Sequence, residues 1–287
     1  MSVSLGLEPL VIALVLVAAL LHASWNAILK TSPDRLTTTG VMNLTGLAVG
    51  FALLPFIASP ARASWVFLLL SMAIHFGYYV FLLGSYRFGD LSQVYPILRG
   101  SAPLVVGLLS APVAAEMLSP TNFAGVALVG FGIVSLSLRG PGDRGFDSRA
   151  VSYALATGLL IAAFTLVDGL GVRRSGNPLA FALWLEALEV WPLLAFALLR
   201  RGGRVVPYLR RHGGRALVGG VMATAAYLLI LAAFARAPIA AVSALRETSV
   251  VMAALIGAVR LREPLGVRRV IASAVVALGA ALVNLSR

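Results

Sequence analysis

The last forty or so residues of this chain weakly repeat a stretch near its middle. Residues 97–138 align without a gap with residues 244–285. The matched pairs include one arginine, one glutamate and one glycine per copy: Arg99 and Arg246, Glu116 and Glu263, Gly132 and Gly279. Each copy reads as a long apolar helix with one buried arginine, a Glu-x-Leu turn and a second apolar helix. Two halves with an ionisable residue at the same depth predict inverted repeats with a binding site between them.

The composition requires lipid as the solvent. The chain is 60% hydrophobic and 12% charged, with a mean hydropathy of +0.94. Soluble domains average roughly 45–50% apolar and about 25% charged residues. Too few polar side chains remain to cover a water-facing surface for 287 residues. The absence of cysteine decides nothing, because a lipid-embedded chain needs no disulfide framework.

The formal charge of +12 would suggest nucleic acid in a soluble protein. Here most arginines lie in short loops between apolar runs, where they act as determinants of membrane topology. We therefore expect lipid and a small molecule as partners, and no nucleic acid. No Lys or Arg precedes the apolar run 10–21, whereas a secretory signal begins with a positive region. This run is predicted to be a retained first span.

The apolar runs predict an all-α integral membrane protein, because each is close to the 20 or so residues that span a bilayer. Ten spans are expected: 9–29, 37–58, 64–85, 91–113, 121–138, 150–171, 178–199, 214–235, 238–259 and 267–285. They leave no room for a soluble domain, so 1–287 forms one transmembrane domain. The Gly- and Pro-rich loop 140–145 divides it into repeats at 9–138 and 150–286. Five spans per repeat force the second copy to enter the membrane in the opposite sense.

The positive residues also predict an orientation. Loops after odd-numbered spans hold most of the Lys and Arg, most densely in 200–215, whereas loops after even-numbered spans and the tails hold few. Positive loops stay in the cytoplasm. We therefore expect loops 139–149 and 200–215 in the cytoplasm and both termini outside.

Three segments resemble a known family. They are residues 22–26 (His-Ala-Ser-Trp-Asn), 116–120 (Glu-Met-Leu-Ser-Pro, followed by Gly125 and Gly132) and 263–266 (Glu-Pro-Leu-Gly, followed by Gly279). With ten spans in a five-plus-five duplication, the chain resembles the EamA-type transporters of the drug/metabolite transporter superfamily. The resemblance implies transport of small molecules such as amino acids, metabolites, nucleotide sugars or drugs. It also implies cytoplasmic termini, which the arginine distribution contradicts.

Arg99 and Arg246 are the main candidates for substrate binding. Each lies about eight residues inside its predicted helix, which is roughly 12 Å of rise. An arginine at the centre of a membrane helix costs about 2.5–3.5 kcal/mol on insertion scales, so it normally faces a cavity or a partner. The pair could hold a carboxylate or phosphate in bidentate fashion. The alternative is that each arginine snorkels or is neutralised by an acid on a neighbouring helix.

Three acids are candidates for proton coupling. Glu186 and Glu189 lie three residues apart and so share one helix face. Glu247 follows Arg246, and because adjacent helical residues do not face each other we expect the two to have different partners. Burial disfavours the ionised carboxylate, so these acids could bind a proton; compensation of the two arginines is the alternative. Asp168, close to a helix end, is expected at the membrane interface.

Aromatic and polar residues at helical spacing predict a cavity wall, because polar groups in lipid must find partners. The candidates for substrate contact are His22, Trp25, Asn26, Tyr79, Tyr95 and Trp184. His75 repeats with Tyr79 the one-turn spacing of His22 and Asn26. Helix packing remains the alternative for the histidines, and interfacial anchoring for the tryptophans.

Glu116 and Glu263 each precede the last helix of a half, which favours capping and dipole contacts over catalysis. The sequence has no metal cluster, phosphate loop or nucleophile motif, so we expect no cofactor and no enzyme. We therefore predict a secondary active transporter in the inner membrane. Its cargo would be a small anionic or zwitterionic metabolite, such as an amino acid, moved by export or exchange. A non-transporting sensor or scaffold, or an intramembrane enzyme, remains the alternative. A monomer is plausible.

Overall fold

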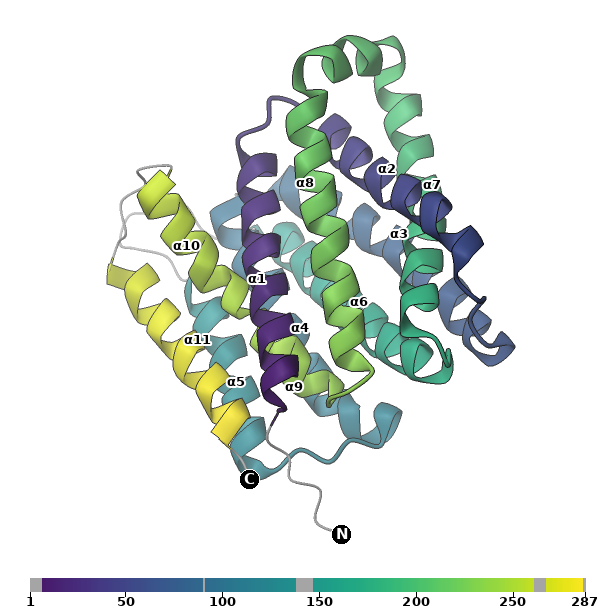
Figure 1. Cartoon of the computed structure of the whole chain (residues 1–287). Helices are drawn as coiled ribbons and strands as arrows, with labels where there is room; N and C mark the ends of the chain where they lie inside the picture. The colour runs from purple at the N-terminus through teal and green to yellow at the C-terminus, as the bar shows by residue number, and fades with distance from the viewer. Residues whose placement is uncertain (1–6, 90, 138–146, 261–266, 286–287) are drawn as a thin grey trace.

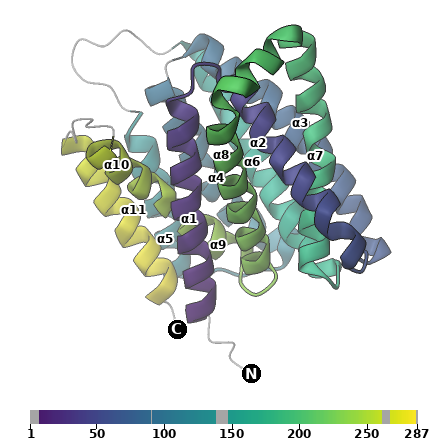
Figure 2. The same ribbon diagram turned by 45° about the horizontal axis from the view of Figure 1, so that its top comes forward.

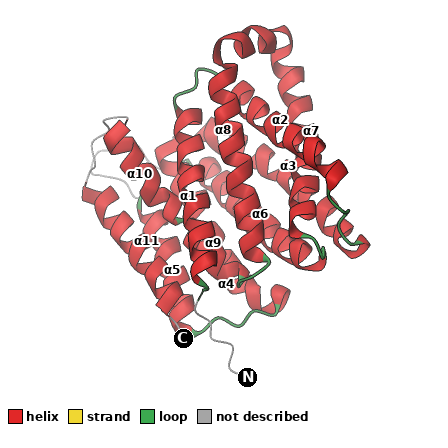
Figure 3. Cartoon of the chain, in the orientation of Figure 1, coloured by secondary structure: helices red, strands yellow, loops and turns green. Residues whose placement is uncertain are grey.

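The computed structural model describes residues 7–89, 91–137, 147–260 and 267–285. These residues form helices, turns and loops, with no strand among them (Figure 3). The helices are α1 (Pro9–Lys30), α2 (Arg35–Leu53), α3 (Trp65–Phe88), α4 (Leu91–Ala114), α5 (Pro120–Ser135), α6 (Ser148–Arg174), α7 (Pro178–Arg201), α8 (Val205–Phe234), α9 (Ile239–Arg246), α10 (Thr248–Arg260) and α11 (Val267–Leu285). Three single-turn 3-10 helices lie at Leu54–Phe56, Arg62–Ser64 and Gly202–Arg204.

The ten predicted spans are confirmed. Eight helical segments are long and apolar enough to cross a membrane, and two shorter apolar helices, Pro120–Ser135 and Val270–Val283, complete the set. Two spans differ from the prediction. The ninth, Ile239–Ile256, is divided between α9 and α10 at Glu247. Helix α8 begins at Val205, so most of the predicted loop 200–215 is helical.

The last helices of the two halves, α5 and α11, pack against each other in opposite directions (Figures 1 and 2). A methyl group on Gly125 of α5 would lie 2.8 Å from the carbonyl oxygen of Gly279 on α11, and one on Gly279 would lie 2.7 Å from the carbonyl oxygen of Gly125. Gly132, further along α5, instead faces Val275, which comes earlier on α11. The two helices are therefore antiparallel, and glycine at both positions allows their backbones to touch.

The remaining pairings follow the same inverted pattern. Helix α1, the first of its half, packs on α8, the third of the other half; α3 and α6 form the matching pair. Helices α2 and α7 pack antiparallel, since Gly46 faces Glu186 while Gly50 faces Leu183. These pairings are the ones expected of two inverted five-helix repeats. The bounds predicted for the repeats, 9–138 and 150–286, stay a prediction.

Because each span crosses the membrane once, the connections fall on two faces. The termini face holds the start of α1 and the end of α11, at the lower edge of Figure 1, and the connections 115–119, 175–177 and 235–238. The mouth face, opposite, holds the connections 31–34 and 202–204. Large apolar side chains such as Phe56, Phe76 and Phe131 are exposed on the outside of the bundle, as lipid contact requires.

Candidate functional site

A cavity of about 300 Å³ lies between the two halves. Eight of the described helices contribute to its wall: α1, α2, α3 and α4 from the first half, and α6, α7, α8 and α9 from the second. Its charged and polar lining residues are His22, Asn26, Arg35, Thr39, Asn43, His75, Arg99, Glu186, Glu189, Thr224 and Arg246. Its aromatic lining residues are Trp25, Tyr78, Tyr79, Tyr86, Tyr95, Phe164 and Tyr227.

The cavity reaches from the middle of the membrane to the mouth face. Its lining begins at the buried Arg246 and extends to Arg35, the exposed first residue of α2. On α6 and α8 the lining residues Phe164 and Ile230 precede the helix ends that lie on the termini face. The cavity is therefore accessible from one side of the membrane.

Arg99 and Arg246 lie at the cavity as predicted, and both contact the same carboxylate. The Nη2 atom of Arg99 lies 2.9 Å from Oε1 of Glu247, and Nε of Arg246 lies 3.7 Å from that oxygen. Both arginines are 7% exposed and Glu247 is 1% exposed. The expectation that Arg246 and Glu247 have different partners is wrong. Since α9 ends at Arg246, Glu247 sits in the turn before α10 rather than on a continuous helix.

The arginines keep unused donors. The Nε atoms of Arg99 and Arg246 are buried and form no hydrogen bond within the described residues. A guanidinium has five N–H donors, and a buried donor without an acceptor costs free energy. A ligand oxygen in the cavity would satisfy these groups. Glu247 itself does not line the cavity, so its place is behind the arginines.

Glu186 and Glu189 line another part of the cavity wall. The Thr224 hydroxyl donates to Oε2 of Glu186 at 3.2 Å. Gly46 leaves the space for that carboxylate, because a methyl group there would collide with it. Oε2 of Glu189 lies 3.5 Å from Nε2 of His75. Both acids are thus held by polar neighbours at the edge of the cavity, where a proton or a cationic group could reach them.

His75 is fixed from several sides. Its Nδ1 atom lies 2.9 Å from the carbonyl oxygen of Ser71, one turn earlier on α3. Its ring stacks on Phe164 of α6, with centroids 4.1 Å apart. These contacts leave Nε2 directed at Glu189. His75 therefore both packs two helices together and lines the cavity.

Asp168 is not at the interface as expected. It is 1% exposed, and the Tyr227 hydroxyl donates to its Oδ2 atom at 2.6 Å. Helix α6 continues to Arg174, which places Asp168 more than one turn inside the helix and on its inner face. The predicted span 150–171 ends only three residues after Asp168, whereas the helix continues to Arg174.

Four of the predicted wall residues line the cavity on α1 and α3: His22, Trp25, Asn26 and Tyr79. Tyr95 joins them from α4. The rings of His22 and Trp25 meet edge to face at 4.9 Å. Asn26 donates to the carbonyl oxygen of His22 at 2.8 Å, which leaves its own side-chain oxygen available.

Trp184 does not line the cavity, contrary to the prediction. Its ring packs on that of Trp65, with centroids 5.0 Å apart. Sequence reasoning missed Tyr78, Asn43 and Tyr227, which do line it. Asn43 donates to the Tyr79 hydroxyl at 3.2 Å. The signal that could have found Asn43 is the rarity of an amide in a membrane helix.

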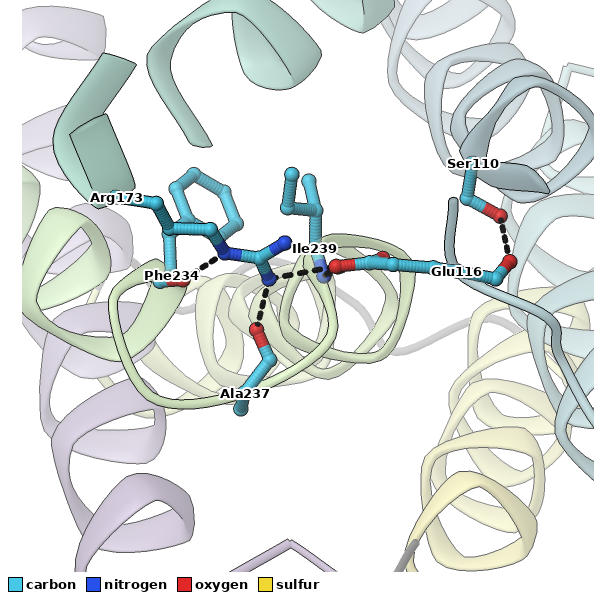
Figure 4. Close-up of polar contacts among 6 residues, drawn as sticks. All are labelled: Ser110, Glu116, Arg173, Phe234, Ala237 and Ile239. Carbon is cyan, nitrogen blue, oxygen red and sulfur yellow. Dashed lines mark hydrogen bonds and ion pairs between the residues drawn. The ribbon is translucent and has the colours of Figure 1, made fainter. Parts of the chain in front are cut away.

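A polar cluster joins the two halves on the termini face (Figure 4). The two carboxylate oxygens of Glu116, which follows α4, accept from the backbone N–H of Ile239 at 3.0 and 2.8 Å. Nη2 of Arg173 lies 2.5 Å from Glu116 and donates to the carbonyl oxygen of Ala237 at 2.7 Å. Nε of Arg173 donates to the carbonyl oxygen of Phe234 at 2.9 Å. We call Glu116, Arg173 and the α8–α9 turn the terminal clamp.

Glu116 therefore caps a helix, but not the one expected. The following helix, α5, is capped by Ser119, whose hydroxyl accepts from the backbone N–H of Asn122 at 3.1 Å. Glu116 instead caps α9 of the other half. Glu263 lies outside the described residues.

Ten spans around a polar cavity between two halves define a helical membrane protein able to hold a polar solute. Residues 148–285, which cover nearly all of the predicted second repeat, match the model of the EamA-like transporter family. Residues 148–285 are thus similar to the EamA-like transporters of the drug/metabolite transporter superfamily, and the fold is that of a multi-pass membrane protein. This is a transporter family, not an enzyme family.

One solved structure, titled "Crystal structure of protein", is similar to the chain along nearly its full length. The TM-score is 0.74 at 19% identity, over 96% of this chain and 96% of that chain. At this identity the likeness shows the fold alone. None of the curated proteins matches the sequence.

Proposed function

We propose that the protein is a secondary active transporter, in the inner membrane, of a small metabolite with an anionic group. One observation supports this most: Arg99 from the first repeat and Arg246 from the second line the same cavity with buried, unused donors. A carboxylate or phosphate would accept charge-assisted hydrogen bonds there, each worth about 1.5–3 kcal/mol net. Since each repeat supplies one arginine, rocking one repeat against the other would expose the site to each side in turn.

The charges favour a single anionic group. Two guanidiniums and the carboxylate of Glu247 leave one net positive charge at the deep end of the cavity. One carboxylate or similar group on the substrate would neutralise it. The exposed Arg35 at the mouth adds to a positive field that attracts anions.

The acids favour a zwitterion over a simple anion. Glu186 and Glu189 line the same cavity as the arginines, so a substrate with an ammonium group could bind both. The volume of about 300 Å³ is at the small end for ligand pockets, which suits an amino acid or a molecule of similar size. Either acid could also bind a proton and couple transport to the proton gradient, by export or by exchange.

The test is substrate counterflow in proteoliposomes, with a panel of labelled L-amino acids, dicarboxylates and organic cations. We expect uptake of a zwitterion or an anion, and at least about a tenfold loss of apparent affinity in Arg99→Lys and Arg246→Lys. Lysine keeps the charge but loses the planar fork. Arg210→Lys, exposed on α8 and outside the cavity lining, is the matched control. Normal affinity in both cavity variants would contradict the bidentate site. No flux of any substrate would favour a sensor or scaffold, and product formation without flux an intramembrane enzyme.

A further inference from the structure

The terminal clamp connects the closed face of the molecule to the substrate arginine of the second repeat. We propose that Glu116 is a positioning residue of the transport cycle: it holds the termini face shut and, through α9, sets the position of Arg246. The role given to Arg246 rests on the proposed function, whereas closure by Glu116 does not.

The side chain of Glu116 connects the first repeat to the second. Glu116 follows α4 of the first half, and its side-chain contacts, Ile239 and Arg173, belong to the second. Its side chain is 11% exposed. Alternating access requires the halves to separate on this face, and separation breaks each of these contacts. Their geometry is therefore specific to the closed face.

Arg173 fastens the turn that Glu116 caps. Its guanidinium donates to the carbonyl oxygens of Phe234 and Ala237, at the end of α8 and in the turn that follows. These carbonyls lie where a helix leaves its last acceptors unpaired. One arginine thus holds the end of α8, the start of α9 and Glu116 together.

The backbone before Glu116 is set for this contact. Ala115 has a φ of 55°, the left-handed region that a residue with a side chain rarely adopts. The turn is fixed by a hydrogen bond of 3.1 Å from the Glu116 N–H to the carbonyl oxygen of Ser110. Strain of this kind persists where the surrounding structure requires it. Here it turns the chain so that Glu116 points across to α9.

Helix α9 links the clamp to the cavity. It has eight residues, all buried, and so extends about 12 Å from Ile239 to Arg246. The break at Glu247 separates it from α10. A short helix with a turn at each end can move as one body. Release of its N-terminus by Glu116 would therefore shift Arg246 at its other end.

The experiment uses the natural absence of cysteine. Spin labels at Thr121→Cys in the first half and Leu179→Cys in the second, both exposed on the termini face and outside the clamp, report its opening as a distance distribution in lipid nanodiscs. Separately, the rate at which an impermeant maleimide modifies Ala241→Cys, on the buried α9, reports access from the termini face. Neither measurement needs the substrate. Glu116→Ala removes the contacts, Glu116→Gln keeps the acceptor without the charge, and Glu8→Gln removes an exposed carboxylate on the same face.

We expect a single short distance between the two spin labels in the parent protein and in Glu8→Gln. In Glu116→Ala a longer population should appear, and the rate of labelling at Ala241→Cys should rise at least about tenfold, as expected for the loss of charge-assisted hydrogen bonds. Glu116→Gln should give distances and labelling rates between those of the parent protein and those of Glu116→Ala. If the alanine variant does not fold, Glu116→Gln alone tests the proposal. Unchanged distances and rates in both variants, or an equal change in Glu8→Gln, would overturn the proposal. If the termini face opens in Glu116→Ala but no tested metabolite is transported, the role of Glu116 in closure stands and the proposed substrate class is rejected.

Discussion

Nη2 of Arg99 lies 2.9 Å from Oε1 of Glu247, and this ion pair joins the two repeats in the buried centre of the protein. An unpaired charge at this depth would be costly, so the pair keeps the empty cavity stable. Because Arg246 shares the same oxygen at 3.7 Å, a substrate anion would compete with Glu247 for both guanidiniums. Glu247 would then act as a built-in counterion that the substrate partly replaces.

Neutralising this counterion should destabilise the protein strongly. In Glu247→Gln two buried guanidiniums lose the carboxylate that both contact, and we expect a loss of about 3–5 kcal/mol in the free energy of unfolding. Denaturant unfolding in detergent measures it. The double variant Arg99→Met with Glu247→Met should recover only part of the stability, because Arg246 still lacks its carboxylate partner, and should not recover transport. An unchanged free energy of unfolding in Glu247→Gln would show that the pair is not needed for folding.

A methyl group at Gly46 should displace Glu186. The glycine on α2 lies directly against the carboxylate, so Gly46→Ala overpacks the contact, which typically costs about 1–3 kcal/mol. We expect a lower melting temperature and impaired transport. Gly214→Ala on α8 is the matched control, because its added methyl group meets open space and should not destabilise the helix. Equal behaviour of the two variants would refute the close approach.

Neutral substitutes for the cavity acids should uncouple proton movement from transport. Glu186→Gln and Glu189→Gln imitate the protonated carboxylate permanently, so neither can release a proton. We expect exchange of substrate across proteoliposomes to persist, while substrate-driven acidification, followed with a trapped pH-sensitive dye, is lost in at least one variant. Proton flux that survives both changes would assign the coupling elsewhere or exclude it.

Replacing Ala115 by glycine should relieve the backbone strain at the left-handed position before Glu116. Ala115→Gly removes a side chain that the positive φ disfavours, and we expect a gain of about 1 kcal/mol in the free energy of unfolding. Ala111→Gly, at a helical position of α4, should instead lose about 0.5–1 kcal/mol. Thermal and chemical unfolding compare the two. Loss of stability in both would mean that residue 115 is not left-handed in solution.

The arginine distribution predicts that both termini lie outside the cell. If this orientation holds, the mouth face and its positive residues lie in the cytoplasm, and the cavity described above is open to the cytoplasm. An alkaline phosphatase fusion at the C-terminus should then be active. A fluorescent protein that matures in the cytoplasm should stay dark there, and its fluorescence would favour the cytoplasmic termini that the family resemblance implies.

The sequence was sufficient for the spans, because hydropathy alone decides which segments can lie in lipid. It was also sufficient to bring Arg99 and Arg246 to one cavity, because the gapless alignment of two repeats puts matched residues at matched depth. It failed where a local backbone feature decides the outcome. The contact of Glu247 with both arginines depends on the helix break, and no proline or glycine within 239–256 signals that break.

The direction in which a side chain points from its helix was the second property that the sequence did not predict. Trp184 and Glu186 lie two residues apart on α7, yet Trp184 packs on Trp65 while Glu186 lines the cavity. On an apolar helix in lipid the hydrophobic pattern does not mark the inner face, so the sequence cannot tell the two directions apart. The partners of Glu116 were equally hidden, because they come from the other repeat.

The glycine contact between α5 and α11 has a consequence for the opposite side of the molecule. Neither helix lines the cavity, and at Gly125 and Gly279 the two backbones meet with no side chain between them. These antiparallel helices are equivalent members of the two repeats, so a tilt of one half against the other would have to change this line of contact. A single added methyl group would act as a wedge there. Close contact between the two repeats at this line thus depends on two side chains that consist of one hydrogen atom each.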